Sequence, residues 1–223
     1  MTNINVNKNI FSFADAVSIA NSCSQSALMI RHSYRESLAN GNYDPGLTDE
    51  GMAYAVECGK FLKGMKDVCF GSSPRKRTVQ TIQGLMQGAE FEEQEIPHHS
   101  VLHDTAMFSK PENLGIFIED GTLGTLLKEY YTTGSAQGFK PAQEYVNSLL
   151  ELLTAEHAKK NLIVSSHDIV AVALLNHFQV YSFVPEDWCG YIQGVFLYRE
   201  NGNWTIAYIV PDKENRPQTT FFV

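Results

Sequence analysis

The sequence predicts an α/β fold, a three-layer sandwich in which a mostly parallel central sheet carries helices on both faces. Two observations predict it. Short apolar runs alternate with longer amphipathic segments, and the apolar runs end abruptly in polar clusters. With 223 residues and 43% hydrophobic residues, one chain of this size buries a core without disulfides or a structural metal. We therefore expect a single domain over residues 1–223.

Three short apolar runs have the length and composition of buried strands. The Asn201-Gly202 dipeptide between two further apolar segments predicts a β-hairpin. Thr48 is expected to cap a helix, and Pro141 fits the first position of another. The predicted strands are residues 26–30, 67–71 and 161–164, and the predicted helices are 11–21, 49–63, 75–86, 141–157 and 169–178. Residues 33–47 are expected to form a loop, and residues 88–140 an inserted, partly helical region that covers a site.

Charge and cysteine content exclude several classes of protein. The net charge of −8 argues against a nucleic-acid platform, which needs clustered Lys and Arg. The four cysteines show no metal-binding or CxxC spacing, so we expect free thiols in a reducing compartment. No apolar run reaches the length of a membrane span, and the first residues lack the pattern of a secretory signal. We expect a cytoplasmic protein with no membrane partner; the sequence does not indicate an oligomeric state.

Polar clusters follow all three predicted strands: Arg31-His32, Ser72-Ser73-Pro74 before Arg77, and His167-Asp168. Ligands of α/β sheets bind outside the carboxyl ends of the strands, so these clusters are expected to form one site. Guanidinium groups suit phosphate oxygens, and a neutral imidazole is a competent nucleophile. An aspartate is then needed to protonate the leaving oxygen. The residue types predict phosphoryl transfer without a metal or other cofactor.

Four segments, in this order, resemble the histidine phosphatase superfamily, which has the phosphoglycerate-mutase-like fold. They are Arg31-His32-Ser33, LTDEGMAYAVECGKFLKG, SSPRKRTVQT and VSSHDIVAVALLN. The resemblance implies that His32 is the nucleophile that becomes phosphohistidine. It also implies that Arg31, Arg77 and His167 hold the transferring phosphoryl group. Arg35, four residues after Arg31, and the His167-Asp168 pair resemble the histidine acid phosphatase branch of the family, which implies that Arg35 is a further phosphate-binding residue.

The resemblance leaves two candidates for the proton donor. Asp168, next to His167, matches the acid phosphatase branch and is preferred. Asp104, in the segment VLHDTAMF, matches the donor segment of the smaller mutase-like branch. Ser33 stands where the family has glycine, and its side chain is expected to narrow the pocket. Arg75 and Lys76 are expected to lie on the surface.

The predicted function is that of a metal-independent phosphomonoesterase acting on a small phosphorylated substrate. One alternative is a catalytically weak member of the same fold that binds phosphorylated ligands or a protein partner; Ser33 is its support. A second alternative is a metal-dependent hydrolase that uses the cluster of His98, His99, His103 and Asp104. That spacing fits no common closed zinc pattern.

Overall fold

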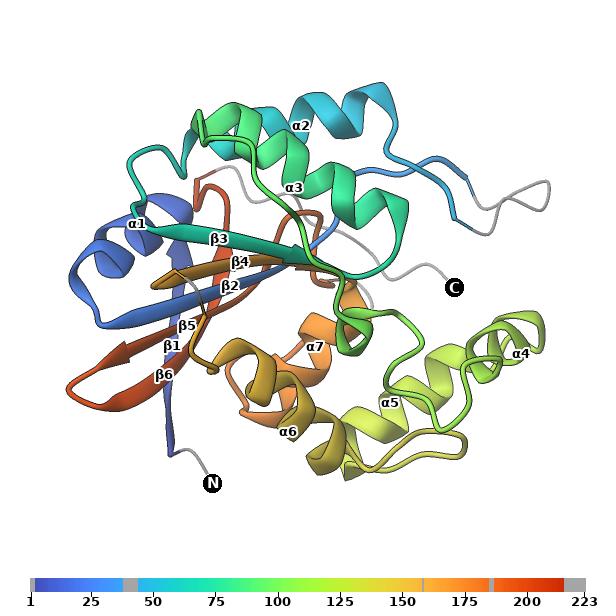
Figure 1. Cartoon of the computed structure of the whole chain (residues 1–223). Helices are drawn as coiled ribbons and strands as arrows, with labels where there is room; N and C mark the ends of the chain where they lie inside the picture. The colour runs from blue at the N-terminus through green and yellow to red at the C-terminus, as the bar shows by residue number, and fades with distance from the viewer. Residues whose placement is uncertain (1–2, 38–43, 158, 185–186, 215–223) are drawn as a thin grey trace.

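The centre of the structure, a computed structural model, is a six-stranded mixed sheet with strand order β1-β6-β5-β2-β4-β3 (Figure 1). The pairs β2–β4, β3–β4 and β1–β6 are parallel, whereas β5 is antiparallel to both β2 and β6. The strands are β1 (Ile4–Ser12), β2 (Gln25–Arg31), β3 (Val68–Ser72), β4 (Asn161–Ser166), β5 (Gly194–Glu200) and β6 (Asn203–Val210). The structure describes residues 3–37, 44–157, 159–184 and 187–214.

Helices cover both faces of the sheet, which makes the predicted three-layer α/β sandwich (Figure 1). Helices α1, α2 and α3 pack on one face, and α5, α6 and α7 pack on the other. The α-helices are α1 (Phe13–Ser22), α2 (Asp49–Lys60), α3 (Lys76–Ala89), α4 (Asn113–Glu119), α5 (Leu123–Thr133), α6 (Ala142–Leu153) and α7 (Asp168–His177). A 3₁₀ helix, η2, spans Ser100–Leu102.

Strand β2 explains why the predicted strands are continuous apolar runs. Ala27 and Met29 belong to the core under α5–α7, whereas Leu28 and Ile30 belong to the core under α1–α3. All four side chains are at most 1% exposed. A strand that is buried on both faces has no solvent side, so alternation disappears from its sequence.

The N-terminal strand β1 has no counterpart among the predicted elements. It lies at the edge of the sheet, and its residues are half-buried or exposed, so it lacks the apolar run that marks the inner strands. The helix predicted from residue 11 therefore begins at Phe13. Ser12 caps it: its hydroxyl accepts from the Asp15 amide, and the Asp15 carboxylate accepts from the Ser12 amide at 2.7 Å.

The other predicted elements are present with small shifts at their ends. Thr48 caps α2, as predicted, and its hydroxyl accepts from the Gly51 amide at 2.9 Å. Pro141 is the residue before α6 and not its first residue. The predicted hairpin joins β5 to β6, and Asn201 and Gly202 both have positive φ (51° and 80°), as the turn between such strands requires.

Residues 88–140 are partly helical, as predicted, and contain η2, α4 and α5. Figure 1 shows α4 and α5 beyond α6 and α7, on the side of the sheet opposite α2 and α3. Phe108, Phe117 and Phe139 pack together there, with ring centroids 4.5–6.1 Å apart. Part of the predicted loop, residues 38–43, lies outside the described residues.

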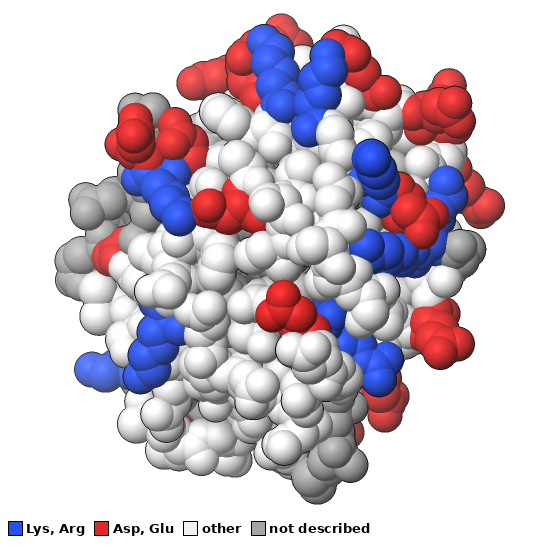
Figure 2. Space-filling view, turned by 90° about the vertical axis from the view of Figure 1, so that its left-hand side faces the viewer, with Lys and Arg blue, Asp and Glu red and all other residues white. Residues whose placement is uncertain are grey.

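The face at the amino ends of β2, β3 and β4 carries charges of both signs, scattered around an uncharged middle (Figure 2). Among the described residues, no helix has the length and apolarity needed to cross a membrane.

The strand register brings the predicted polar clusters together. Arg31 at the end of β2 is opposite Ser166 of β4, and Ser72 at the end of β3 is opposite Ser165. The residues that follow each strand, His32, Ser73 and His167, therefore leave the sheet at one edge.

Candidate active site

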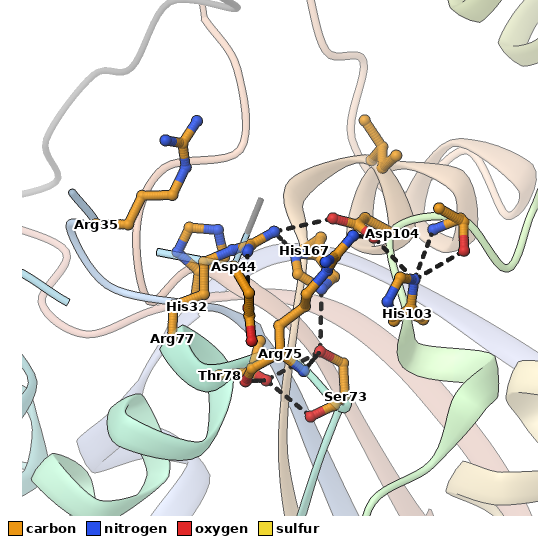
Figure 3. A network of polar contacts seen from close by, with 12 residues as sticks. His32, Arg35, Asp44, Ser73, Arg75, Arg77, Thr78, His103, Asp104 and His167 are labelled. Atoms are coloured by element: carbon orange, nitrogen blue, oxygen red, sulfur yellow. Dashed lines mark hydrogen bonds and ion pairs between the residues drawn. The ribbon is translucent and has the colours of Figure 1, made fainter. Parts of the chain in front are cut away.

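The polar residues at this edge form one network (Figure 3). His32 and His167 are both buried, at 4% and 2% exposed, and their ring centroids are 5.5 Å apart. Arg77 lies at the start of α3 and is 5% exposed. Burial of three ionisable side chains in one place is costly unless a charged ligand or partner compensates, which is typical of a functional site.

The hydrogen bond of His32 fixes its tautomer. Its Nδ1 lies 2.7 Å from the carbonyl oxygen of Ser33, which only accepts, so Nδ1 carries the proton. Nε2 then presents a lone pair. Burial lowers the pKa of His32 well below its ordinary value, and the positive charges of Arg77 and Arg31 act in the same direction. At neutral pH His32 is a neutral imidazole with a free Nε2, the form that a nucleophile requires.

His167 has the opposite tautomer to His32. Its Nδ1 is 3.3 Å from an Arg77 guanidinium nitrogen, which only donates, so Nδ1 accepts and Nε2 carries the proton. Nε2 then donates to the Ser73 hydroxyl at 3.0 Å. Burial lowers the pKa of His167 to about 3, against the nearby charge of Asp104, which raises it.

Arg31 and Arg77 have buried donors that lack hydrogen-bond partners within the part of the chain that the structure describes. These are Nε of Arg31 and both Nε and Nη1 of Arg77. The nearest carboxylate to Arg77 Nη1 is Asp44, at 3.7 Å, which is an ion pair without a hydrogen bond. Buried guanidinium donors without partners are expensive, so they indicate a site for an anion.

Asp104 is in the network, and Asp168 lies at its margin. One oxygen of Asp104 is 2.9 Å from Arg77 Nη2 and the other is 3.2 Å from Arg75 Nη2. Asp168 is 3.2 Å from Arg31 Nη2 and accepts from the Trp188 indole at 3.1 Å. Each of the two candidate proton donors is thus paired with a guanidinium.

Several interactions set the charge of Asp104. Burial raises the pKa of this carboxyl, but nearby groups together lower it well below its ordinary value. Those groups are the His167 ring, a hydrogen bond with His103, and the guanidiniums of Arg75 and Arg77. At neutral pH Asp104 is therefore a carboxylate.

Arg75 corrects the prediction that it lies on the surface. It immediately precedes α3, two residues before Arg77, and its side chain is only 23% exposed because it reaches Asp104. A run of basic residues gives no sign of which member faces inward, whereas Lys76 is exposed as predicted.

Ser33 does not narrow the pocket as expected, because its side chain is turned into the fold. Its hydroxyl donates to the Gly51 carbonyl at 2.7 Å, and its amide donates to the Thr81 hydroxyl at 2.9 Å. A Cβ on Gly51 would lie 2.0 Å from the carbonyl oxygen of Tyr34. The glycine of the LTDEG segment therefore allows α2 to press against the loop that carries His32.

Arg31 has support that was not predicted from sequence. Its guanidinium donates to the Cys189 carbonyl at 2.7 Å and lies 4.2 Å above the centre of the Tyr191 ring.

Arg35 lies apart from the network. Figure 3 shows its guanidinium turned away from the other labelled residues, and it donates to the Glu36 carbonyl at 2.9 Å.

The histidines of the alternative metal cluster point in different directions. His98 contacts the Ser72 hydroxyl at 3.0 Å, His99 lies against Gly71, and His103 contacts Asp104 at 2.8 Å. Among the described residues there is no group of three or more His, Cys, Asp or Glu that is able to hold a metal ion. This arrangement does not support the metal-dependent alternative.

A family model described as "Histidine phosphatase superfamily (branch 1)" matches residues 27–107. The matched segment contains Arg31, His32, Arg77 and Asp104. Over these residues the chain is similar to the histidine phosphatase superfamily. His167 and Asp168 lie beyond the match, at the positions that the fold brings to the same edge.

Several solved structures have a similar fold. A phosphoglycerate mutase from Bacillus anthracis is 14% identical, with a TM-score of 0.56 over 84% of this chain and 93% of that one. A mycobacterial glucosyl-3-phosphoglycerate phosphatase is 16% identical, with a TM-score of 0.53 over 83% and 98%. A phosphoserine phosphatase from Entamoeba histolytica is 17% identical, with a TM-score of 0.53 over 84% and 98%. A search of curated proteins found no match. At these identities the neighbours show a shared fold.

The buried neutral histidines of the site predict acid sensitivity. The folded pKa of His167, about 3, lies below its unfolded value near 6.5, so below pH 6.5 the unfolded chain binds the additional proton. This contribution is absent above pH 6.5 and destabilises the fold progressively as pH falls towards 3. From pH 7 to pH 5, His167 alone is expected to lower the free energy of unfolding by roughly 2 kcal/mol.

Urea denaturation at the two pH values measures this effect. The variant His167→Asn is expected to lose less stability than the wild type between pH 7 and pH 5. An equal loss in both proteins would contradict the assignment of a neutral buried His167.

Proposed function

We propose that this chain is a phosphatase that hydrolyses small phosphomonoesters through a phosphohistidine on His32. The observation that carries the proposal is the pairing of a neutral His32, whose Nε2 is free, with buried Arg31 and Arg77 donors that lack partners among the described residues. These are the two requirements of phosphoryl transfer to nitrogen: a lone pair and a cradle for phosphate oxygens.

In the first step, the Nε2 lone pair of His32 attacks phosphorus, and the bond between phosphorus and the ester oxygen breaks. Arg31, Arg77 and His167 hold the phosphoryl oxygens, and the electron pair of the broken bond departs with the leaving oxygen. In the second step, water attacks the phosphorus of phosphohistidine and its proton passes to the Asp104 carboxylate. The bond between phosphorus and Nε2 breaks, which releases inorganic phosphate and neutral His32. Positioning and charge stabilisation supply most of the rate acceleration.

We assign proton transfer to Asp104 and support of Arg31 to Asp168. Asp104 contacts Arg77, and Figure 3 shows His167 between Asp104 and His32, which puts Asp104 on the side opposite the nucleophile. In-line displacement directs the leaving group to that side. Asp168 bonds instead to Arg31 and Trp188, so it orients a phosphate-binding residue.

The two aspartates are expected to respond differently to mutation. Asp104→Asn removes the proton-transfer group and is expected to lower kcat by about 10²- to 10⁴-fold. Asp168→Asn loosens Arg31 and is expected to raise KM more than it lowers kcat. Steady-state kinetics with p-nitrophenyl phosphate measures both variants. A kcat loss confined to Asp168→Asn would instead assign proton transfer to Asp168.

We propose that hydrolysis needs no metal, because Arg31, Arg77 and the imidazoles supply the positive charge and the donors that the phosphoryl group requires. Hydrolysis of p-nitrophenyl phosphate is expected to be unchanged in excess chelator. The double variant His98→Ala/His99→Ala, which changes the alternative cluster, is expected to keep wild-type activity. Loss of activity in chelator that added zinc restores would overturn this part of the proposal.

Two further observations support a catalytically active enzyme that acts on small substrates. The binding-only alternative rested on Ser33, but its side chain is bonded to Gly51 and leaves Nε2 of His32 free. Structural neighbours include phosphatases of phosphoserine and glucosyl-3-phosphoglycerate, which are small phosphorylated molecules. The substrate-covering role of residues 88–140 and a cytoplasmic location stay predictions.

A further inference from the structure

We propose that Arg75 restricts this enzyme to phosphate compounds whose leaving groups depart as stable anions, namely aryl phosphates and acyl phosphates, by keeping Asp104 ionised. The inference rests on the proposed function, because it concerns the step in which His32 takes the phosphoryl group. It concerns the choice among substrates and not the presence of activity.

The geometry around Asp104 carries the inference. Each carboxylate oxygen contacts a different guanidinium: Oδ1 lies 3.2 Å from Arg75 and Oδ2 lies 2.9 Å from Arg77. The Asp104 side chain is only 12% exposed, so little water competes for these contacts. Charge-assisted hydrogen bonds to both oxygens favour the carboxylate over the protonated acid.

Substrate binding affects the two arginines differently. A phosphoryl group in the proposed cradle engages Arg77 and weakens its hold on Asp104. Arg75 is not one of the residues assigned to the phosphoryl group, and it contacts Asp104 through the other oxygen. Arg75 therefore continues to hold Asp104 ionised once the substrate is bound, beside His103, whose Nδ1 lies 2.8 Å from the same oxygen.

An ionised Asp104 suits one chemical step and not the other. In the first step, it has no proton to give, so the leaving oxygen must accept the electron pair of the broken bond and depart as an anion. Phenolates and carboxylates do this readily, whereas alkoxides do not. In the second step, the same carboxylate accepts the proton that water loses as it attacks phosphohistidine. Arg75 thus favours dephosphorylation at the expense of poor leaving groups.

Arg75 is a positioning residue in this scheme, because it acts through Asp104. Its removal is expected to affect the dependence of the first step on the leaving group more than the affinity for phosphate. The test is the rate of the first step, measured in single turnovers by rapid quench with a series of substituted phenyl phosphates and phenethyl phosphate. Phenethyl phosphate has an alkoxide leaving group on a comparable carbon frame.

In the wild type, the rate is expected to fall steeply as the phenol becomes less acidic, and phenethyl phosphate is expected to be the slowest substrate. Arg75→Gln removes the charge at similar size, and the ratio of the phenethyl to the p-nitrophenyl rate is expected to rise about tenfold, the effect of one pKa unit on the protonated fraction of Asp104. Arg75→Lys keeps the charge and is expected to keep a ratio near the wild-type value. Lys76→Gln, which removes an adjacent exposed charge, is expected to leave the ratio unchanged.

The outcomes separate this inference from the proposed function. Equal leaving-group dependence in the wild type and Arg75→Gln overturns the inference, even if both proteins are active. An equal rise of the ratio in Arg75→Gln and Lys76→Gln overturns it as well, because it assigns the effect to general charge. If the wild type transfers no phosphoryl group from p-nitrophenyl phosphate, or His32→Ala does so equally well, the proposed function itself fails.

Discussion

His32→Ala is expected to lower kcat for p-nitrophenyl phosphate by about four to six orders of magnitude, the range seen when a covalent nucleophile is removed. The variant loses Nε2, the only protein atom in the scheme that bonds to phosphorus. Arg31 and Arg77 remain, so the variant is still expected to bind phosphate. The residual activity therefore reports the contribution of binding and charge stabilisation alone.

The matched control is His177→Ala at the end of α7, which removes a half-buried histidine outside the site. Its kcat is expected to equal that of the wild type. Inhibition by inorganic phosphate and thermal unfolding of His32→Ala show whether the variant keeps a folded site. A folded His32→Ala that retains more than a few per cent of wild-type kcat would contradict the nucleophilic role.

Arg77→Ala is expected to lower kcat/KM by about 10³-fold or more, since removal of even one preorganised donor costs about 10²- to 10³-fold. The variant loses three interactions of the Arg77 guanidinium. Its Nε and Nη1, which lack hydrogen-bond partners among the described residues, no longer donate to phosphate oxygens. Its Nη2 no longer contacts His167, and Asp104 loses one of two cations. The effect is expected in KM and in kcat, because phosphate is bound in both the ground state and the transition state.

Arg77→Lys separates charge from geometry. It keeps a cation but loses the planar fork of donors, so its kcat/KM is expected to lie between those of the wild type and Arg77→Ala. The inhibition constant of inorganic phosphate, compared with that of Lys76→Ala, measures the binding part. A phosphate affinity unchanged in Arg77→Ala would place the anion elsewhere.

The residues at the strand ends were predictable from sequence because each follows a short apolar run and belongs to a polar cluster directly after it. The apolar runs that become β2 and β4 are recognisable when buried on both faces, and their ends place Arg31, His32 and His167 at one sheet edge. The same reasoning failed for β1, whose half-exposed edge position leaves no apolar run.

The residues that surround the catalytic histidines were harder to predict. Asp104 follows η2 in a region without regular periodicity, so only the family resemblance pointed to it, and Asp168 was preferred. Arg75 lay in a basic run with nothing to distinguish it from Lys76. Trp188 reaches Asp168 from a segment that local patterns do not connect to the site. In each case the deciding contact is tertiary, and no local pattern encodes it.

The central claim is that His32 carries the phosphoryl group, and trapping that intermediate tests it most directly. The enzyme is mixed with a ³²P-labelled aryl phosphate, quenched in denaturant at alkaline pH within the first turnover, and digested for peptide mapping. The account predicts label that is stable in alkali, lost in acid, confined to the peptide containing His32 and absent from His32→Ala. Turnover without a labelled peptide, or label on a serine or aspartate, would contradict it.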